Sequence, residues 1–377
     1  MRIGYDGKRA ANNFTGLGNY SRTLITQLAS LFPIHQYFVY TEKTKDSPQI
    51  NSFFSQKSVY LKLKAQSLTK ILWRTIGIKK QLISDNLDLY HGLSYELPIG
   101  IKNLPIKTIV TIHDLIYLRY PEYYKLIDRK IYDWKSRYAC ANSTRIVAIS
   151  ERTKNDLIEL YNIDESKIDV IYQSCDDSFK SPSSKESKTA VLNKYNLPEK
   201  YLLIVGTVEA RKNLLLAVKA LKDVNQDYKL VVIGKKLVYA DLVLKQIHIL
   251  NLTDRVIFLE GLPFIDLPPI YQMASVFVYP SFYEGFGIPI IEALYSRIPV
   301  VAATGSCLEE AGGPDSIYID PNNANDFAVQ INKVLNDPAL KLKMIEKGSQ
   351  YVRKFDNQSL AQQMMDCYKK TLETKEQ

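Results

Sequence analysis

Several kinds of sequence signal are missing from this chain of 377 residues, and each absence narrows its class. The chain has four cysteines, none of them in a CxxC pair: Cys140, Cys175, Cys307 and Cys367. We therefore expect ordinary thiols in a reducing compartment rather than a disulfide framework. No apolar run approaches the roughly 18 residues of a membrane-spanning helix, and residues 1–6 do not begin a signal peptide. These absences predict a cytoplasmic protein.

Positive charge is unevenly distributed along the chain, which carries 49 Lys and Arg against 40 Asp and Glu, a net charge of +9. Residues 1–175 hold 25 of the basic and 16 of the acidic residues, so the whole excess lies there and residues 176–377 balance at 24 each. A basic first half favours an anionic partner such as lipid headgroups, a phosphorylated acceptor or nucleic acid. A solvated basic face that serves solubility explains the excess equally well.

Short apolar runs alternate with helical patterns throughout. The strands expected in the first half are 2–6, 37–40, 87–91, 108–112 and 145–149. Those expected in the second half are 201–206, 229–234, 256–259, 276–279, 300–303 and 317–319. Alternation of strand and helix implies parallel sheets covered by helices on both faces. The chain is therefore predicted to be α/β, with two doubly wound, Rossmann-like domains.

A stretch rich in Ser, Lys and Asp, residues 174–190, indicates an exposed linker after Ile171. We accordingly expect a first domain at 1–173 and a second at 174–356, followed by a last helix at about 358–370.

The most informative segment is a glycine loop between the apolar run at 276–279 and a helix. Gly285 and Gly287 allow a sharp turn and a close approach to a ligand. The helix start then presents free N–H groups and a positive dipole end to an anion. Glu284 and Glu292 flank this anion site. Carboxylates are unfavourable beside an anion, so we expect these two to bind neutral hydroxyl groups. A sugar nucleotide offers both a diphosphate and hydroxyls.

Two carboxylates in one segment also suit a glycoside hydrolase. A hydrolase does not need the diphosphate cradle that surrounds this pair, so we favour the sugar-nucleotide interpretation.

Two adjacent cations, Arg211 and Lys212, follow the strand expected at 201–206. Ligands bind at the carboxyl ends of the strands in such sheets. Arg offers a planar fork for phosphate and Lys a point charge. Together they can hold a diphosphate and stabilise the charge that it gains on leaving. The alternative is a solvated basic turn.

A second glycine cluster, residues 15–20 with Gly16 and Gly18, lies between the first strand and a helix but lacks the third glycine of the dinucleotide fingerprint. It is either a flexible turn or a loop whose backbone N–H groups touch a phosphate or sugar. His113, followed by Asp114, ends the strand expected at 108–112 and can point into a cleft, although a lone His is more often structural.

Residues 57–81 combine cations with Leu, Ile and Trp73. A basic amphipathic helix with a Trp can lie at a membrane interface, and a surface helix of a Rossmann-like domain is the alternative. The cations are Lys62, Lys64, Lys70, Arg74, Lys79 and Lys80.

Taken in order along the chain, these features carry a resemblance to a known family. The motifs are Gly16-Leu17-Gly18, His113-Asp114, Ser150-Glu151-Arg152, Arg211-Lys212-Asn213 and the element from Glu284 to Glu292. The chain resembles the retaining glycosyltransferases of family 4, with the GT-B architecture of two Rossmann-like domains and an interdomain cleft. Residues 15–20 and 113–120 are most similar to the bacterial mannosyltransferases that build surface polysaccharides.

The resemblance implies roles for individual side chains. Arg211 and Lys212 would hold the donor diphosphate. Glu284 would hydrogen-bond the donor sugar, His113 would contact that sugar near the reacting centre, and Glu292 would take the two ribose hydroxyls.

The resemblance also implies backbone contacts to the donor. Gly16 and Gly18 would let the first domain's loop close over the diphosphate. The phosphate would be capped by backbone N–H groups at Gly285, Phe286, Gly287 and Ile288. The nucleobase would lie against the loops at Gly234 and Leu262. The last helix, with residues 357–377, would pack back on the first domain.

The activity that this resemblance implies is hexose transfer with retention of configuration. The leaving phosphate oxygen would accept the proton of the acceptor hydroxyl, so no protein base is needed. The donor would be GDP-mannose, with a UDP-sugar as the second choice. The acceptor would be a glycan or a polyprenyl-diphosphate-linked sugar at the inner membrane surface. Because no Asp-x-Asp motif is present, we predict that the enzyme needs no metal and no cofactor.

Three other functions remain open at this point. A sugar-nucleotide epimerase can share the architecture, and a non-catalytic partner of another transferase can share the fold. A nucleic-acid binder would explain the basic half, but no helix-turn-helix, zinc or RNA-binding aromatic signature accompanies the charge.

Overall fold

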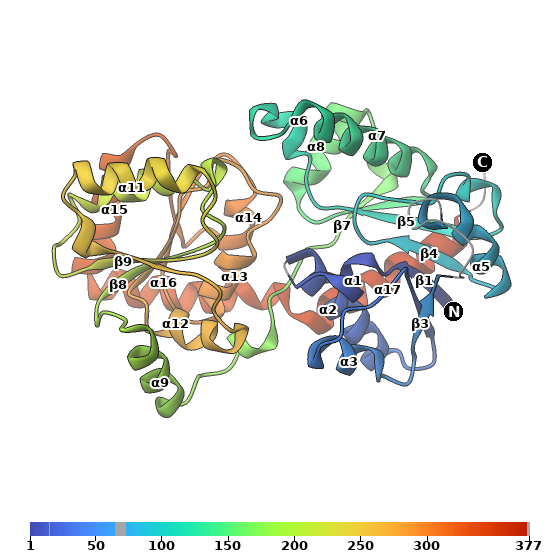
Figure 1. Cartoon of the computed structure of the whole chain (residues 1–377), viewed down its shortest axis with the longest axis horizontal. Helices are drawn as coiled ribbons and strands as arrows, with labels where there is room; N and C mark the ends of the chain where they lie inside the picture. Colours follow the sequence, from blue (N-terminus) through green and yellow to red (C-terminus); the bar gives the residue numbers. More distant parts are fainter. Residues whose placement is uncertain (15, 65–72, 375–377) are drawn as a thin grey trace. The chain divides into compact units, whose positions relative to one another are not determined.

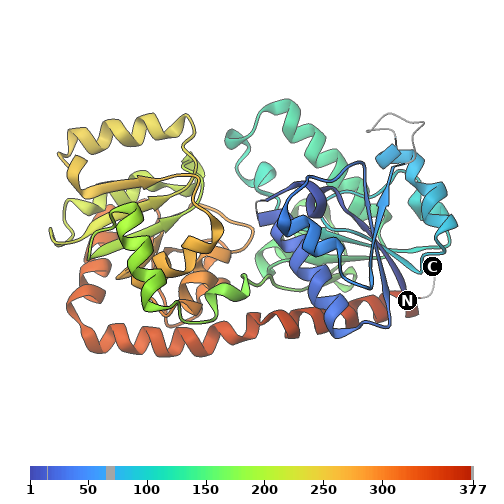
Figure 2. The same ribbon diagram turned by 60° about the horizontal axis from the view of Figure 1, so that its bottom comes forward.

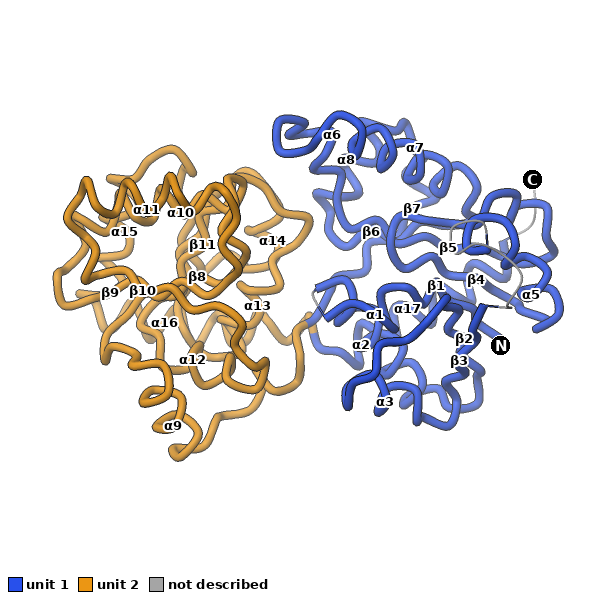
Figure 3. The backbone as a smooth tube through the Cα atoms, viewed as in Figure 1, with its two compact units in different colours: residues 1–174, 356–377 blue, residues 175–355 orange. Residues whose placement is uncertain are grey.

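The computed structural model describes residues 1–14, 16–64 and 73–374, which form two compact units (Figures 1 and 3). Unit 1 comprises Met1–Ser174 and Asp356–Gln377, and unit 2 comprises Cys175–Phe355. Each unit is built around one parallel β-sheet.

The sheet of unit 1 has the strand order β3-β2-β1-β4-β5-β6-β7. Its strands are β1 (Arg2–Asp6), β2 (Gln36–Thr41), β3 (Val59–Leu63), β4 (Leu89–Gly92), β5 (Lys107–Ile112), β6 (Arg145–Ala148) and β7 (Ile168–Val170). Its α-helices are α1 (Lys8–Asn12), α2 (Gly16–Leu31), α3 (Pro48–Phe54), α5 (Ile78–Ser84), α6 (Ile116–Arg119), α7 (Leu126–Asn142), α8 (Glu151–Tyr161) and α17 (Asn357–Glu373).

Successive side chains along each strand point to opposite faces of this sheet, and each face packs in its own apolar layer. Tyr5 and Val39 pack with α2 and α17 on one face, and Tyr40 packs with α5, α7 and α8 on the other. Helix α17 lies beside α2 (Figure 2). The Tyr368 hydroxyl of α17 lies 2.8 Å from Nδ1 of the buried His91 in β4. Helix α17 is therefore part of the core of unit 1.

The sheet of unit 2 has the order β10-β9-β8-β11-β12-β13. Its strands are β8 (Tyr201–Val205), β9 (Lys229–Ile233), β10 (Val256–Leu259), β11 (Val276–Tyr279), β12 (Val300–Ala303) and β13 (Ile317–Ile319). Its α-helices are α9 (Lys185–Tyr195), α10 (Leu214–Leu221), α11 (Tyr239–Ile249), α12 (Leu267–Met273), α13 (Ile288–Tyr295), α14 (Leu308–Gly312), α15 (Ala324–Asn336) and α16 (Pro338–Tyr351).

Strand order reverses direction between β8 and β11, since β9 and β10 continue to one side and β12 and β13 to the other. In a doubly wound sheet, ligands bind outside the carboxyl ends of the strands at such a switch point. A ligand-binding site is therefore expected at the loops that follow β8 and β11.

The prediction of a basic amphipathic helix at 57–81 is wrong for the first part of that segment. Val59–Leu63 is the edge strand β3, paired with β2, because its chain extends along β2 and buries Val59. Trp73 is only 2% exposed and packs in the core, so it is not available to a membrane. Residues 65–72, which include the predicted cation Lys70, lie outside the described residues.

Two further predictions need correction. The stretch at 174–190 is not a simple exposed linker, because Phe179 is fully buried and α9 begins at Lys185. Gly16 and Gly18 lie in the first turn of α2 rather than in a loop before it, and Thr15 is outside the described residues. A Cβ at Gly18 would lie 1.9 Å from the Asn13 carbonyl oxygen, so glycine serves close packing there.

In the part of the chain that the structure describes, no helix has the length and apolar character needed to cross a bilayer.

Candidate active site

Two segments far apart in the sequence meet at the switch point of unit 2. After β8, a 3-10 turn at Ala210–Lys212 carries two cations. After β11, the chain runs through Glu284 to the start of α13. Because β8 and β11 are hydrogen-bonded neighbours, both segments emerge at the same edge of the sheet, and Phe282 N–H donates to the Arg211 carbonyl over 2.9 Å.

Glu284 forms ion pairs with both cations. Its Oε2 lies 2.7 Å from Nη1 of Arg211, and its Oε1 lies 2.5 Å from Nζ of Lys212. Nη2 of Arg211 also binds Glu209 at 2.7 Å. Two cations and two carboxylates thus gather at this edge, and their charges cancel in the ligand-free protein.

The pKa values of the cluster follow from burial and these pairs. Burial alone would raise the pKa of Glu284, but Lys212 and Arg211 outweigh it and lower that pKa to about 2. Burial lowers the pKa of Arg211, and Glu284 and Glu209 more than reverse this, so that its pKa is raised. Glu284 is therefore ionised at neutral pH and offers acceptor oxygens only.

Neighbouring groups hold the cations in place. Lys212 Nζ donates to the Tyr279 hydroxyl at the end of β11, over 2.6 Å. Asn213 takes a left-handed conformation with φ of 55°, and its amide donates to the carbonyls of Pro280 and Pro321 over 3.1 and 2.8 Å. Asn tolerates this conformation better than most residues, so Asn213 can end the cation turn and start α10.

The predicted glycine loop leads into a helix, as the sequence indicated. Gly285, Phe286 and Gly287 lead directly into α13, whose first residue is Ile288. The first N–H groups of a helix have no partner within it. A Cβ at Gly287 would lie 2.8 Å from the Cβ of Ala311, so this position requires a small residue for packing.

Cys307 braces the same loop. Its buried Sγ lies 3.0 Å from the carbonyl oxygens of both Glu284 and Phe286. The thiol therefore contacts the loop at two points, Glu284 and Phe286, just before the start of α13.

Glu292 is separate from the cation cluster. The Tyr271 hydroxyl of α12 donates to its Oε2 over 2.7 Å. Burial, with a smaller contribution from Asp176, raises the pKa of Glu292 to about 7 against the lowering effect of Tyr271. This carboxyl group therefore changes charge near neutral pH.

Gly234 and Leu262 follow β9 and β10, on the same edge of the unit 2 sheet. A Cβ at Gly234, where φ is +158°, would lie 1.9 Å from the Gly206 carbonyl oxygen. Gly234 thus lets the loop after β9 touch the loop that leads to the cations. Leu262 is half-buried.

His113 lies in unit 1, just after β5, and is 4% exposed. Its Nε2 donates to the Leu93 carbonyl over 2.8 Å, which leaves Nδ1 to accept from the Gln173 amide at 3.0 Å. Burial lowers the pKa of His113 to about 4, although the bond to Leu93 opposes this. The imidazole is therefore neutral at physiological pH, with both nitrogens engaged. The edge of Tyr20 also faces its ring, at 5.0 Å between centroids.

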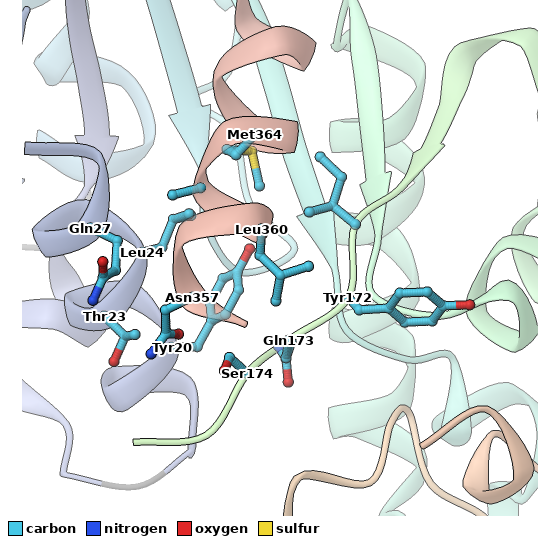
Figure 4. A pocket seen from close by; sticks show the side chains of 12 residues that line it. Tyr20, Thr23, Leu24, Gln27, Tyr172, Gln173, Ser174, Asn357, Leu360 and Met364 are labelled. Atoms are coloured by element: carbon cyan, nitrogen blue, oxygen red, sulfur yellow. The ribbon is translucent and has the colours of Figure 1, made fainter. Parts of the chain in front are cut away.

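Gln173 also lines a pocket of unit 1 that lies between α2, residues 171–174 and the start of α17 (Figure 4). Tyr20 and Asn357 also line this pocket. Two neighbours of His113, Gln173 and Tyr20, are therefore among its lining residues.

The structure brings Arg211, Lys212 and Glu284 into direct contact and sets Gly285–Ile288 beside them. Four groups that hold the site residues were not predicted from the sequence: Glu209, Tyr279 and Cys307 at the cation cluster and the glycine loop, and Tyr271 at Glu292. Glu209 could have been suspected from its place two residues before Arg211. The others depend on strand order and helix packing. Among the residues that the structure describes, no group of three or more His, Cys, Asp or Glu could hold a metal ion.

Comparison with known proteins gives a family for both units. Residues 14–179 match the model of Glycosyltransferase Family 4, and residues 185–351 match that of Glycosyl transferases group 1. The chain is 28% identical to O-antigen chain mannosyltransferase B of Escherichia coli over 371 residues, which cover 94% of this chain and 96% of that protein.

Solved structures share the fold. A glycosyltransferase from Rickettsia africae ESF-5 is similar with a TM-score of 0.76 at 19% identity, covering 100% of this chain and 99% of that one. HepE of Anabaena, solved in complex with UDP and glucose, gives a TM-score of 0.76 at 15% identity, covering 98% and 100%. The two Rossmann-like domains are those of the GT-B architecture, as expected from the sequence. The chain belongs to the glycosyltransferases that join a family 4 domain to a group 1 domain.

Proposed function

We propose that this glycosyltransferase moves mannose from GDP-mannose to a glycan or polyprenyl-diphosphate-linked acceptor, with retention of configuration, in surface polysaccharide synthesis. The observation that carries the proposal is the cluster of Arg211, Lys212 and Glu284 at the switch point of unit 2. Similarity to an O-antigen chain mannosyltransferase supports mannose and the polysaccharide. A UDP-sugar is the second donor, supported by the UDP complex of HepE.

Donor binding exchanges the partners of the cations. In the free protein Glu284 and Glu209 neutralise them. A diphosphate carries more negative charge than one carboxylate and suits the planar fork of Arg211. Glu284, ionised and partly released, then accepts hydrogen bonds from hydroxyls of the donor sugar.

The same cations serve the chemical step. As the bond between the anomeric carbon and the phosphate oxygen breaks, charge accumulates on the diphosphate, where Arg211 and Lys212 are already placed to stabilise it. The acceptor oxygen bonds to the anomeric carbon on the face that the phosphate leaves. Its proton passes to the departing phosphate oxygen. Both ring nitrogens of His113 are hydrogen-bonded within unit 1, and burial lowers its pKa to about 4, so we do not assign it the role of base. Its proposed role is contact with the donor sugar.

We base the other proposed donor contacts on the family resemblance. N–H groups at Gly285–Ile288 bind phosphate oxygens at the start of α13. Glu292, when ionised, accepts from both ribose hydroxyls. The base lies by the loops of Gly234 and Leu262. In unit 1, Gly16 and Gly18 bring the first turn of α2 to the diphosphate.

Thermal unfolding with GDP-, UDP-, dTDP- and ADP-sugars in the presence of EDTA tests the proposal. A donor at a hundred times its dissociation constant adds about 2.7 kcal/mol to stability. A selective shift with GDP-mannose, lost in Arg211→Ala, supports the site and its independence from metal. No shift with any of them would favour the non-catalytic partner. Product analysis with donor alone separates the transferase from an epimerase.

The anomeric configuration of the transferred sugar, read from the NMR coupling of its product, tests retention. An inverted product would refute the proton path through the leaving phosphate.

A lipid-linked acceptor places the protein at the inner face of a membrane, as a peripheral protein of the cytoplasm. The charge balance supports this, since residues 1–175 carry the whole basic excess.

A further inference from the structure

Helix α7 of unit 1 carries large apolar side chains on its solvent side. Leu126 is 56% exposed, Ile127 73%, Ile131 45% and Trp134 56%. With 3.6 residues per turn, positions 126, 127, 130, 131 and 134 fall on one side of a helix. We define the α7 face by these residues: Leu126, Ile127, Lys130, Ile131 and Trp134.

The opposite side of the same helix provides the packing. Ser136, Ala139 and Cys140 are its buried residues, and the last two belong to the core cluster on that face of the sheet. The α7 face is therefore not needed to hold the helix on unit 1. Contiguous exposed apolar surface of this kind marks an interaction site.

The apolar surface continues beyond α7. Trp134 stacks on Tyr138, with ring centroids 6.1 Å apart. The Tyr138 hydroxyl accepts from the backbone at Gly100 over 2.6 Å, next to Ile99, which is 36% exposed. Ile99 N–H in turn binds the carbonyl of Thr75, next to the exposed Ile76. Contacts thus connect three segments of chain that expose Trp or Ile.

Cations accompany this surface. Lys130 lies within the α7 face and is exposed, as is Lys125 before the helix. Residues 125–137 contain five Lys and Arg against two Asp. Arg137 is paired with Asp133 and Lys135 with Glu96, so Lys125, Arg129 and Lys130 stand against Asp128 outside these pairs. The surface is therefore apolar at its centre and basic around it.

We propose that the α7 face docks the protein on the surface of an anionic lipid bilayer. Trp and Ile set among Lys and Arg are the chemistry of helices that lie in a membrane interface, where the rings enter the headgroup layer and the cations meet anionic lipids. The site differs from the one expected at residues 57–81, whose Trp73 is buried.

The docking surface lies on the side of unit 1 that the proposed acceptor must approach. Helix α7 follows β5 and packs back along it, so its first turn lies toward the carboxyl edge of the sheet, where His113 follows β5. This consequence rests on the proposed function, whereas the docking itself does not.

The test measures binding of the full-length protein to vesicles without any donor or acceptor. Vesicles of phosphatidylcholine alone are compared with vesicles that also contain phosphatidylglycerol. We expect binding to the anionic vesicles, and Ile127→Asp to weaken it at least about tenfold. Lys130→Glu weakens it roughly tenfold, with the difference shrinking at high salt.

Matched changes in unit 2 serve as controls. Ile265 is also 73% exposed, so Ile265→Asp makes the same substitution at an equally exposed site. Lys219→Glu repeats the charge reversal at an exposed position of α10. Both controls should bind vesicles as the unchanged protein does. Trp134→Ala provides a second test of the α7 face, and thermal unfolding checks that each variant is folded.

Two results would overturn the proposal. One is vesicle binding that Ile127→Asp and Trp134→Ala leave unchanged. The other is absence of binding to the anionic vesicles. A dimer that Ile127→Asp converts to monomer would then make the α7 face an interface between two copies. Because no nucleotide is present, failure here is distinct from failure of the donor panel.

Discussion

Glu284 holds two buried cations at once, and its replacement by Gln predicts a large and pH-dependent loss of stability. The substitution preserves size but removes the charge that faces Arg211 and Lys212 at 2.7 and 2.5 Å. The side chain of Glu284 is 11% exposed and those of the cations 15% and 16%, so water screens these pairs little. Removing one partner of a buried ion pair leaves an uncompensated charge.

The magnitude follows from the pKa of Glu284, which drops from 4.5 to about 2 in the folded protein. A shift of about 2.5 units corresponds to about 3.4 kcal/mol. A depressed carboxyl pKa contributes stability that is fully present above the unfolded value and is lost as the pH falls through the folded value. We therefore expect Glu284→Gln to cost about 3 kcal/mol at pH 7 and about 2 kcal/mol at pH 3.5.

Urea unfolding at both pH values measures the effect, with Glu346→Gln on the exposed surface of α16 as the matched control. If the donor diphosphate replaces Glu284 as the partner of Arg211 and Lys212, GDP-mannose should stabilise Glu284→Gln more than the unchanged protein, because the diphosphate supplies the missing negative charge. A loss below about 1 kcal/mol at pH 7 would refute the argument. So would a loss that grows as the pH falls.

Four more predictions concern the reaction. Arg211→Ala should lower the rate of sugar transfer at least about a hundredfold, roughly 3 kcal/mol in the barrier, in single-turnover assays with a folded variant; a rate like that of the unchanged enzyme would exclude the role of Arg211 in catalysis. Because burial raises the pKa of Glu292 to about 7, stability from this group falls as the pH rises from about 4.5 to 7. Glu292→Gln should therefore raise the melting temperature at pH 8 and not at pH 4, while weakening donor binding at pH 8; equal melting shifts at both pH values would contradict this. Transfer should persist in EDTA, and its complete loss would show a metal requirement. The pH profile should contain no titration of His113 between pH 6 and 9, since burial holds its pKa at about 4; an NMR titration of its ring with a midpoint near 6.5 would contradict the buried geometry.

Much of the fold could be predicted from the sequence because most strands are continuous apolar runs. Runs such as 201–206 and 276–279 are buried on both faces of a parallel sheet and match β8 and β11 almost to the residue. Both edge strands of unit 1 were missed. Strand β3 is exposed at Tyr60 and Leu61 and carries Lys62, and β7 has only three residues. At an edge, pairing with β2 rather than apolar content decides the structure.

The candidate site was predictable in its members but not in their pairing. Glycine, cation and carboxylate motifs each pointed to a loop at the end of a strand. That Glu284 faces Arg211 and Lys212 depends on β8 lying next to β11, which follows from the strand order of the whole sheet. Burial likewise decides that Trp73 belongs to the core and that Trp134 does not, although both stand among cations in the sequence.

The position of α17 in the core of unit 1 affects how the protein folds during its synthesis on the ribosome. Six residues of α17 complete a core whose other buried members come from the first 174 residues: Leu360, Ala361, Met364, Met365, Cys367 and Tyr368. All of unit 2 is translated in between. At about 5–20 residues per second, the nascent first unit waits for tens of seconds with the groove for α17 open. Unit 2 can fold in that interval. A chaperone that shields apolar surface would therefore act on unit 1, whose core closes only after α17 has emerged from the ribosome.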